Sequence, residues 1–216
     1  MSKSDSNQPL QLAFWRSPSS IRIPLQNAVS SATGAMNIKQ TSLPGVVILE
    51  PRVCSDGRGF FFESYNAAEL AKAGLDYEFV QDNHSRSNLN VLRGLHYQIR
   101  QTQGKLVRVV SGAVFDVAVD LRRNSPNFGK WVGVHLNEEN KQMLWIPPGF
   151  AHGFVVTSKS ADFLYKATAY YAPAAERTIR WDDPDIAIEW PLNGSPTVSA
   201  KDQDGVRFRD AEVFES

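Results

Sequence analysis

The chain has one cysteine and no excess of charge of either sign. Cys54 has no partner for an intramolecular disulfide and is not a metal site by itself, which fits a reducing compartment or indifference to redox state. Twenty-three basic and twenty-three acidic residues cancel, so net charge does not draw the protein to nucleic acid or to an anionic membrane. An anionic ligand would therefore have to be held by a local cluster of basic side chains.

Long hydrophobic runs and the common nucleotide motifs are also missing. No apolar run approaches the roughly 18 residues of a membrane span, and the first 35 residues lack the apolar core of a secretory signal. Neither a Gly-rich phosphate loop nor a Gly-x-Ser-x-Gly nucleophile turn is present. The sequence therefore predicts a cytoplasmic protein with no membrane or nucleic-acid partner.

The composition changes near Met36. Residues 1–35 are rich in Ser, Gln, Asn and Pro and show no sustained periodicity, which predicts a disordered N-terminal extension. A translation start placed too early and an organelle transit peptide are two interpretations of this segment. Residues 36–216 are predicted to form a single domain, because the chain is 42% hydrophobic and long enough for one core.

Strand signals follow one another closely after Met36. In "VFDVAVDL" the residues Phe115 and Val117 fall on one face, whereas Val114 and Asp116 fall on the other. Turn sequences such as "SDGRG" and "PPGFAHG" separate the runs at the spacing typical of a sandwich or barrel. The runs are 45–53, 77–85, 105–112, 113–121, 130–136, 143–149, 153–157 and 162–171. They predict an all-β fold, an antiparallel jelly-roll barrel.

Helical signals are few. Only "NAAELAKAG", residues 66–74, reads as a helix, and no alternation of strand and helix suggests a parallel sheet. From about Tyr171 the chain becomes rich in proline and acidic residues, and we expect this part to wrap the barrel with few core residues. It is not expected to form a second domain.

Polar residues on otherwise apolar strands are the best indicators of a site, because small barrels bind ligands in the mouth or interior. His96 and Lys105 are nine positions apart, and Gly104 offers a turn that would place their strands side by side. Each residue also has a structural interpretation, as a surface charge or a hydrogen-bonded histidine. The candidates are Arg93, His96, Lys105, Asp116, His152 and Tyr165, with Lys166 beside the last.

Metal binding is the main competing interpretation for such a barrel. The four histidines, His84, His96, His135 and His152, include no His-x-His pair and no helical pair four apart. A metal site formed by three ligands that converge from distant parts of the sequence is an open alternative. The pattern favours a site without a metal or other cofactor.

A metal-free site with histidine, lysine, tyrosine and aspartate can remove a proton beside a carbonyl group. Such chemistry needs a base that titrates near neutrality, a cation or donor for the enolate oxygen, and an acid that returns the proton. An acid on the face opposite the base inverts the carbon, so the reaction would be an epimerisation without a cofactor. The sequence alone does not show whether the acid and the base lie on opposite faces of the substrate.

From Met36 nearly to its end, the chain resembles the dTDP-4-dehydrorhamnose 3,5-epimerases of the dTDP-sugar epimerase family, which have a cupin-like jelly-roll fold. The resemblance covers about 165 residues and rests on ordered stretches. These are "LPGVVILEPRV", "DGRGFFFE", "FVQDNHSRS", "LRGLHYQ", "QGKLVRVVSGAVFDVAVDLRRNSPNFGKW", "WIPPGFAHGF", "YKATAYYAP" and "IEWPL".

The resemblance implies a role for each catalytic candidate. His96 would be the general base, and Asp202 in "SAKDQDG" would be the carboxylate that orients it. Lys105 would stabilise the enolate oxygen, and Tyr165 would deliver a proton from the other face. Residues that would bind or surround the nucleotide sugar are Arg58, Glu63, Gln81, Asn83, Arg93, Asp116, His152 and Tyr171.

The implied substrate is dTDP-4-dehydro-6-deoxy-D-glucose, epimerised at C3 and C5 to dTDP-4-dehydro-L-rhamnose. The implied assembly is a homodimer, in which some nucleotide-binding residues reach across the interface. Cys54 departs from the aromatic residue that relatives commonly carry at its position. Open alternatives are a relative that epimerises one carbon, a 4-keto sugar isomerase, a non-catalytic sugar-nucleotide-binding barrel and a metal-dependent oxygenase.

Overall fold

A computed structural model describes residues 36–215, and in this range the predicted all-β class is confirmed. The predicted extension, residues 1–35, lies outside the described residues. The strands are β1 (Asn37–Gln40), β2 (Val47–Glu50), β3 (Cys54–Asp56), β4 (Gly59–Phe61), β5 (Gln81–Asn88), β6 (Leu92–Gln98), β7 (Lys105–Ser111), β8 (Ala113–Asp120), β9 (Trp131–Asn137), β10 (Met143–Ile146), β11 (Phe150–Val156), β12 (Ser160–Ala167) and β13 (Glu176–Thr178).

Helices are short throughout the described range. The predicted helix forms as α1 (Ala67–Lys72), and it begins at Asn66, whose side chain accepts hydrogen bonds from the backbone N–H groups of Ala68 and Glu69. The others are α2 (Ala200–Gln203) and the 3₁₀ helices η1 (Pro173–Ala175) and η2 (Phe208–Asp210). None is long and apolar enough to cross a membrane.

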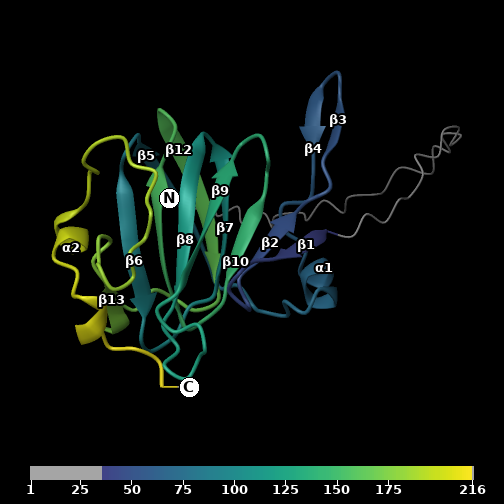
Figure 1. Ribbon diagram of the computed structural model, residues 1–216. Helices are drawn as coiled ribbons and strands as arrows, with labels where there is room; N and C mark the ends of the chain where they lie inside the picture. The colour runs from purple at the N-terminus through teal and green to yellow at the C-terminus, as the bar shows by residue number, and fades with distance from the viewer. Residues whose placement is uncertain (1–35, 216) are drawn as a thin grey trace, which may run out of the picture. The chain divides into compact units, whose positions relative to one another are not determined.

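The strands form two large antiparallel sheets and one hairpin (Figure 1). The six-stranded sheet has the order β1-β2-β10-β7-β12-β5, and the five-stranded sheet has the order β13-β6-β11-β8-β9. Within residues 36–215 no strand pairing joins the edges of the two sheets, so the predicted barrel is a sandwich that is not closed. The hairpin pairs β3 with β4 and projects beyond the sandwich.

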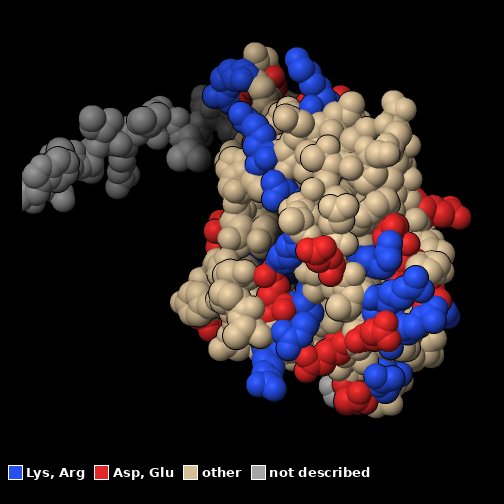
Figure 2. Space-filling view, turned by 90° about the vertical axis from the view of Figure 1, so that its left-hand side faces the viewer, with Lys and Arg blue, Asp and Glu red and all other residues tan. Residues whose placement is uncertain are grey.

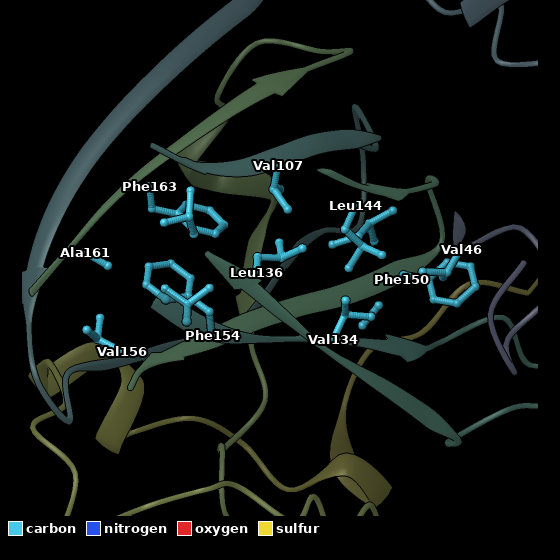
Figure 3. Packing of buried hydrophobic residues seen from close by; sticks show 14 of the residues in the cluster. Val46, Val107, Val134, Leu136, Leu144, Phe150, Phe154, Val156, Ala161 and Phe163 are labelled. Carbon is cyan, nitrogen blue, oxygen red and sulfur yellow. The ribbon is translucent and has the colours of Figure 1, made fainter. Parts of the chain in front are cut away.

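The main core lies between the two sheets (Figure 3). Val107 and Phe163 come from the six-stranded sheet, and they meet Leu136 and Phe154 of the five-stranded sheet. Full burial of one such side chain stabilises the fold by roughly 1.5–3 kcal/mol. This apolar layer holds the two sheets face to face.

Strand β8 is buried on both faces, as its alternation predicts. Val114 and Ala118 point into the core between the sheets, whereas Phe115 and Val117 join a second cluster on the other side of the five-stranded sheet. The C-terminal segment covers that side. Its Ile179 is fully buried there, so the segment wraps the sheet as expected but contributes more core than the sequence suggested.

One strand starts later than its sequence pattern predicts. The run 77–85 becomes β5 only from Gln81 onward. The rings of Tyr77 and Phe79 instead pack on Trp145, with centroid distances of 4.5 and 5.9 Å. The aromatic residues of this run therefore cover the six-stranded sheet instead of pairing with it.

The surface on the side of β5, β6 and α2 carries charges of both signs, which are distributed unevenly (Figure 2). Basic and acidic side chains intermingle over its lower part, whereas the upper part carries a row of basic side chains beside a broad uncharged area. Because the net charge is zero, an anionic ligand would be attracted by local groups of basic side chains and not by the protein as a whole.

Candidate active site

Two histidines lie side by side on the inner face of the five-stranded sheet. His96 on β6 is opposite His152 on β11, and Thr178 on β13 lies on the other side of His96. Asp116 on β8 is fully buried, and its carboxylate oxygens lie 2.9 and 3.1 Å from Nε2 of His152. This sheet therefore supplies both histidines and a buried carboxylate.

Two glycines allow β6 and β11 to approach closely beside these histidines. Gly94 has φ of +129°, and a Cβ atom there would lie 2.5 Å from Cα of Gly153. A Cβ atom on Gly153 would lie 2.8 Å from the carbonyl oxygen of Arg93. A side chain at either position would push the strands apart and displace His96 from His152.

The six-stranded sheet supplies the facing groups. Ala167 on β12 pairs with Gln81 on β5 and with Lys105 on β7. Two residues earlier on β12, Tyr165 pairs with Asn83 on β5, so its side chain lies on the same face of the sheet. Nζ of Lys105 lies 6.0 Å from the centroid of the Tyr165 ring. Lysine and tyrosine thus share the inner face of this sheet.

The expectation that the strands of His96 and Lys105 lie side by side is wrong. Strand β6 belongs to the five-stranded sheet, and β7 belongs to the six-stranded sheet. The chain between them, residues 99–104, crosses from one sheet to the other instead of forming a hairpin turn. The two residues consequently come from facing sheets.

His96 forms a dyad with Asp202. Nε2 of His96 is hydrogen-bonded to Oδ1 of Asp202, which lies on α2, and the carboxylate is almost completely buried. Burial raises the pKa of Asp202, but the hydrogen bond and charge of His96 and the hydrogen bond from Ser199 outweigh it, and the pKa is lowered. Asp202 is therefore a carboxylate that accepts the Nε2–H of His96, which leaves Nδ1 with its lone pair.

Nearby acidic groups counteract only part of the effect of burial on the pKa of Lys105. Burial lowers the pKa of Lys105 to about 8, although the charges of Asp116 and Glu176 favour the ammonium form. Burial likewise raises the pKa of Asp116 and lowers the pKa of His152, and the hydrogen bond between them opposes both shifts. Lys105 is thus still mostly an ammonium group at pH 7, but one with little solvation.

Tyr165 stays protonated over a wide pH range. Burial raises the pKa of its phenol, the nearby charge of Glu176 raises it further, and Arg93 lowers it. Arg93 is exposed and donates a hydrogen bond from Nε to Oγ of Ser87, at 3.1 Å. A protonated phenol beside cationic groups is suited to donate a proton.

Three predicted binding residues form a hydrogen-bonded chain. The backbone N–H of Tyr171 donates to Oε1 of Gln81 at 2.8 Å, and Nε2 of Gln81 donates to Oδ1 of Asn83 at 2.9 Å. The Nδ2 group of Asn83 is buried without a hydrogen-bond partner. This free donor can bind an acceptor atom of a ligand.

Sequence reasoning missed Glu176 and Lys201. Glu176 on β13 accepts a hydrogen bond from the Tyr171 hydroxyl at 2.8 Å and forms an ion pair with Lys201 on α2 at 2.5 Å. No motif marks either residue. The position of Lys201 next to Asp202 was the only signal that could have indicated it.

Arg58 and Glu63 are not brought to this cluster. Arg58 lies in the turn of the β3–β4 hairpin, where its side chain is 92% exposed and pairs with Asp56 at 2.6 Å. Glu63 accepts a hydrogen bond from Nδ2 of Asn66 at 3.2 Å. Cys54 is exposed on the same hairpin, directly opposite Phe61.

The other two histidines also lie away from the cluster. His84 is bonded to Asp162 at 3.1 Å and is largely exposed, and His135 is exposed on β9. Across residues 36–215, no group of three or more His, Cys, Asp or Glu side chains is placed to hold a metal ion.

The arrangement has the groups needed to remove and return a proton beside a carbonyl. The five-stranded sheet carries a histidine that is hydrogen-bonded to Asp202, and the facing sheet carries a cation and a phenol. A substrate held between them would meet the base on one side and the acid on the other.

Comparisons with known proteins point to one family. A sequence profile described as dTDP-4-dehydrorhamnose 3,5-epimerase matches residues 40–210. A Pseudomonas aeruginosa protein of that name is 59% identical over 180 residues, which cover 83% of this chain and 99% of the relative.

Solved structures agree with the sequence comparison. A dTDP-6-deoxy-D-glucose-3,5-epimerase from Legionella pneumophila, in complex with dTDP-4-keto-L-rhamnose, matches with a TM-score of 0.82 and 50% identity over 84% of this chain and 98% of its own. A 3'-monoepimerase from Streptomyces bikiniensis, in complex with dTDP-quinovose, matches with a TM-score of 0.75 and 33% identity over 78% of this chain and 86% of its own.

Proposed function

This chain belongs to the dTDP-4-dehydrorhamnose 3,5-epimerase family, and we propose that it converts dTDP-4-dehydro-6-deoxy-D-glucose to dTDP-4-dehydro-L-rhamnose. The observation that carries the proposal is the pairing of His96 with Asp202 on one side of the sandwich, facing Lys105 and Tyr165 on the other. Both reacting carbons, C3 and C5, adjoin the C4 carbonyl, so one set of groups can act on each in turn.

The base in this mechanism is Nδ1 of His96. It takes the proton from C3, and the electron pair of the broken C–H bond forms the C3–C4 double bond while the carbonyl oxygen becomes an enolate. The Asp202 carboxylate stabilises the imidazolium that results, because it accepts the Nε2–H. The Lys105 ammonium stabilises the enolate oxygen.

Tyr165 completes the inversion. Its hydroxyl gives a proton to the opposite face of C3, the enolate returns to the ketone, and the tyrosine is reprotonated from solvent while His96 loses its proton. The raised pKa of Tyr165, caused mainly by burial, keeps the phenol protonated before the step. The same sequence at C5 gives the L-rhamno configuration, and no cofactor takes part.

The nucleotide part of the substrate needs further residues. We assign Gln81, Asn83 and Tyr171 to it, because they form one hydrogen-bonded chain and Asn83 has a free donor. Arg93 and His152 would contact the sugar or its diphosphate, and Asp116 would hold His152. The substrate is charged and does not cross membranes unaided, so the protein would act in the cytoplasm.

We further propose a homodimer. The β3–β4 hairpin projects from the sandwich, and its Phe60 and Phe61 are 61% and 72% exposed. Arg58 and Glu63 lie on or next to this hairpin, so in a dimer they would contact the nucleotide in the site of the second copy. Cys54 provides no aromatic ring for stacking there, and its strand partner Phe61 does.

The test is proton NMR of substrate in deuterium oxide, without added metal or cofactor. Loss of the C3 and C5 signals, with the L-rhamno product captured by a reductase, is the expected result. Loss of the proton signal at only one carbon would indicate a single-site epimerase like the Streptomyces relative. No exchange at either carbon would indicate a sugar-nucleotide-binding protein without catalytic activity.

Two variants assign the base. His96→Ala should abolish exchange at both carbons, whereas His84→Ala, which removes a histidine outside the site, should exchange like the wild type. Exchange at the wild-type rate in a folded His96→Ala variant would contradict the role of His96. Elemental analysis of the same samples tests for a metal.

A further inference from the structure

The chain between β12 and β13 carries Tyr171, one of the residues assigned above to the nucleotide. Strand β12 of the six-stranded sheet ends at Ala167, and β13 of the five-stranded sheet begins at Glu176. Residues 168–175, called the connector below, therefore cross from one sheet to the other. The position of the connector decides where Tyr171 lies relative to the site.

The middle of the connector is not held by its own main chain. Within residues 36–215, the N–H and C=O groups of Ala169, Tyr170 and Tyr171 make no hydrogen bond to another main-chain group. A segment without such bonds moves easily unless side chains hold it. In this connector, three glutamine side chains do so.

Gln98 on β6 makes the largest number of these contacts. Its Nε2 group donates to the carbonyl oxygens of Gln101 and Tyr170, at 2.8 and 3.2 Å, and its Oε1 accepts the N–H of Ala172 at 2.8 Å. Both N–H groups of the amide are used, and the residue is only 4% exposed. One buried amide thus holds the connector immediately before and after Tyr171.

Two more glutamines bond to the same segment. Gln103, between β6 and β7, donates from Nε2 to the carbonyl oxygen of Ala169 at 2.8 Å. Gln81 on β5 accepts the N–H of Tyr171 at 2.8 Å. Gln81 belongs to the six-stranded sheet and Gln98 to the five-stranded sheet, so the connector is held from both sheets.

We propose that Gln98 is a positioning residue for nucleotide binding, which holds the connector so that Tyr171 is in place before the substrate binds. This inference rests on the proposed function, which assigns Tyr171 to the nucleotide. Because both N–H groups of Gln98 are already bonded, the residue acts through Tyr171 and not as a donor to the substrate. A connector that is fixed in advance reduces the entropy lost on binding.

The contacts of His96 separate an effect on binding from an effect on the chemical step. Gln98 lies two positions after His96 on β6, so the two side chains are on the same face of the strand. His96 is held by its hydrogen bond to Asp202 and by the pairing of its strand with β11 and β13, and the Gln98 side chain takes part in neither. Loss of the amide should therefore weaken nucleotide binding and leave proton removal from bound substrate nearly unchanged.

The experiment compares Gln98→Met, Gln103→Met and Gln142→Met with the wild type in the full chain. Methionine has nearly the length of glutamine but no amide. Gln142 is the matched control, because its Nε2 donates to Oε1 of Glu50 at 2.8 Å, between β9 and β10 and outside the site. Calorimetry gives the Kd of dTDP, proton exchange at C3 and C5 gives kcat and KM, and urea unfolding reports folding.

In Gln98→Met the Kd of dTDP and the KM should both rise about tenfold, the effect expected when a side chain must be ordered during binding. The kcat should stay within about threefold of the wild-type value, because uniform binding is lost and not transition-state stabilisation. Gln103→Met removes one hydrogen bond instead of three, so its Kd should rise about threefold, and this variant keeps the proposal testable if Gln98→Met does not fold. Gln142→Met should match the wild type.

A Tyr171→Ala background tests whether the glutamines act through Tyr171. Adding Gln98→Met or Gln103→Met to Tyr171→Ala should change the Kd no further, because the side chain that they position is gone. A further rise as large as in the single variant would overturn the proposal, as would an unchanged Kd in a folded Gln98→Met protein. A fall in kcat with KM unchanged would also overturn it, since Gln98 would then act on His96.

The proposed function fails separately. A wild-type protein that binds dTDP but exchanges neither proton is not an epimerase, and the Kd values of the variants would still decide the role of Gln98. A wild-type protein that does not bind dTDP would overturn both proposals. Normal exchange in the wild type beside an unchanged Kd in Gln98→Met overturns only the role of Gln98.

Discussion

Replacing Lys105 with methionine should make the protein more stable and less active. Burial lowers the pKa of Lys105 from 10.5 to about 8, so the folded state at pH 7 carries an ammonium that would be better solvated in the unfolded chain. The difference between the two pKa values corresponds to at most about 3 kcal/mol, and partial exposure of the side chain reduces it. Methionine removes this penalty, and Asp116 keeps His152 as its partner.

The sign of the pH dependence follows from linkage. The penalty is fully present below pH 8, and it disappears as pH rises from 8 toward 10.5, because the unfolded chain then binds more protons than the folded one. Urea unfolding at fixed protein concentration should show Lys105→Met more stable than the wild type at pH 7. At pH 9.5 the gain should fall to less than about half of that value.

The loss of activity should be large, because the enolate oxygen loses its cation. We expect kcat to fall about 10²- to 10³-fold, the usual effect of removing one such group. In the wild type, the charged fraction of Lys105 falls about tenfold between pH 7 and pH 9, so exchange at C3 should decline over this range. A variant that is less stable at pH 7, or one that exchanges protons at the wild-type rate, would refute the reasoning.

Three further variants test the rest of the site. Asp202→Asn should lower kcat by about 100-fold or more, because the imidazolium of His96 loses its anion, and a pH-rate profile that matches the wild type would contradict this. Tyr165→Phe should spare proton removal more than inversion, so deuterium should enter C3 without product forming in a reductase-coupled assay; normal epimerisation at both carbons would require another acid. Gly153→Ala should destabilise the fold by about 1–3 kcal/mol, since its Cβ atom would lie 2.8 Å from the Arg93 carbonyl, and an unchanged urea midpoint would show that β6 and β11 can separate freely.

Much of the fold could be predicted because it depends on local patterns. The alternation in β8 separates Val114 from Phe115 whatever the strand pairs with, because successive side chains of a strand point to opposite faces. Asn66 marks the start of α1 through its own hydrogen bonds to the next turn. The motifs from residue 40 onward also indicate the family, because their order along the chain is enough to recognise it.

The candidate site could be predicted only in part from such patterns. His96, Lys105 and Tyr165 stand out because they are polar residues on strands that otherwise bury apolar side chains. Glu176 and Lys201 do not stand out, because one lies on a three-residue strand and the other on a one-turn helix. Segments this short have no periodicity from which an inward-facing residue can be recognised.

The sequence by itself determined the all-β class, the alternation of side chains on strands such as β8 and the types of group available for proton transfer. Only the tertiary structure decided that β6 and β7 belong to facing sheets, and that Glu176 on β13 pairs with Lys201 on α2 beside the site. The physical reason is that side-chain alternation is set by the local backbone. Strand pairing and the docking of α2 depend instead on hydrogen bonds and burial between segments far apart in the chain.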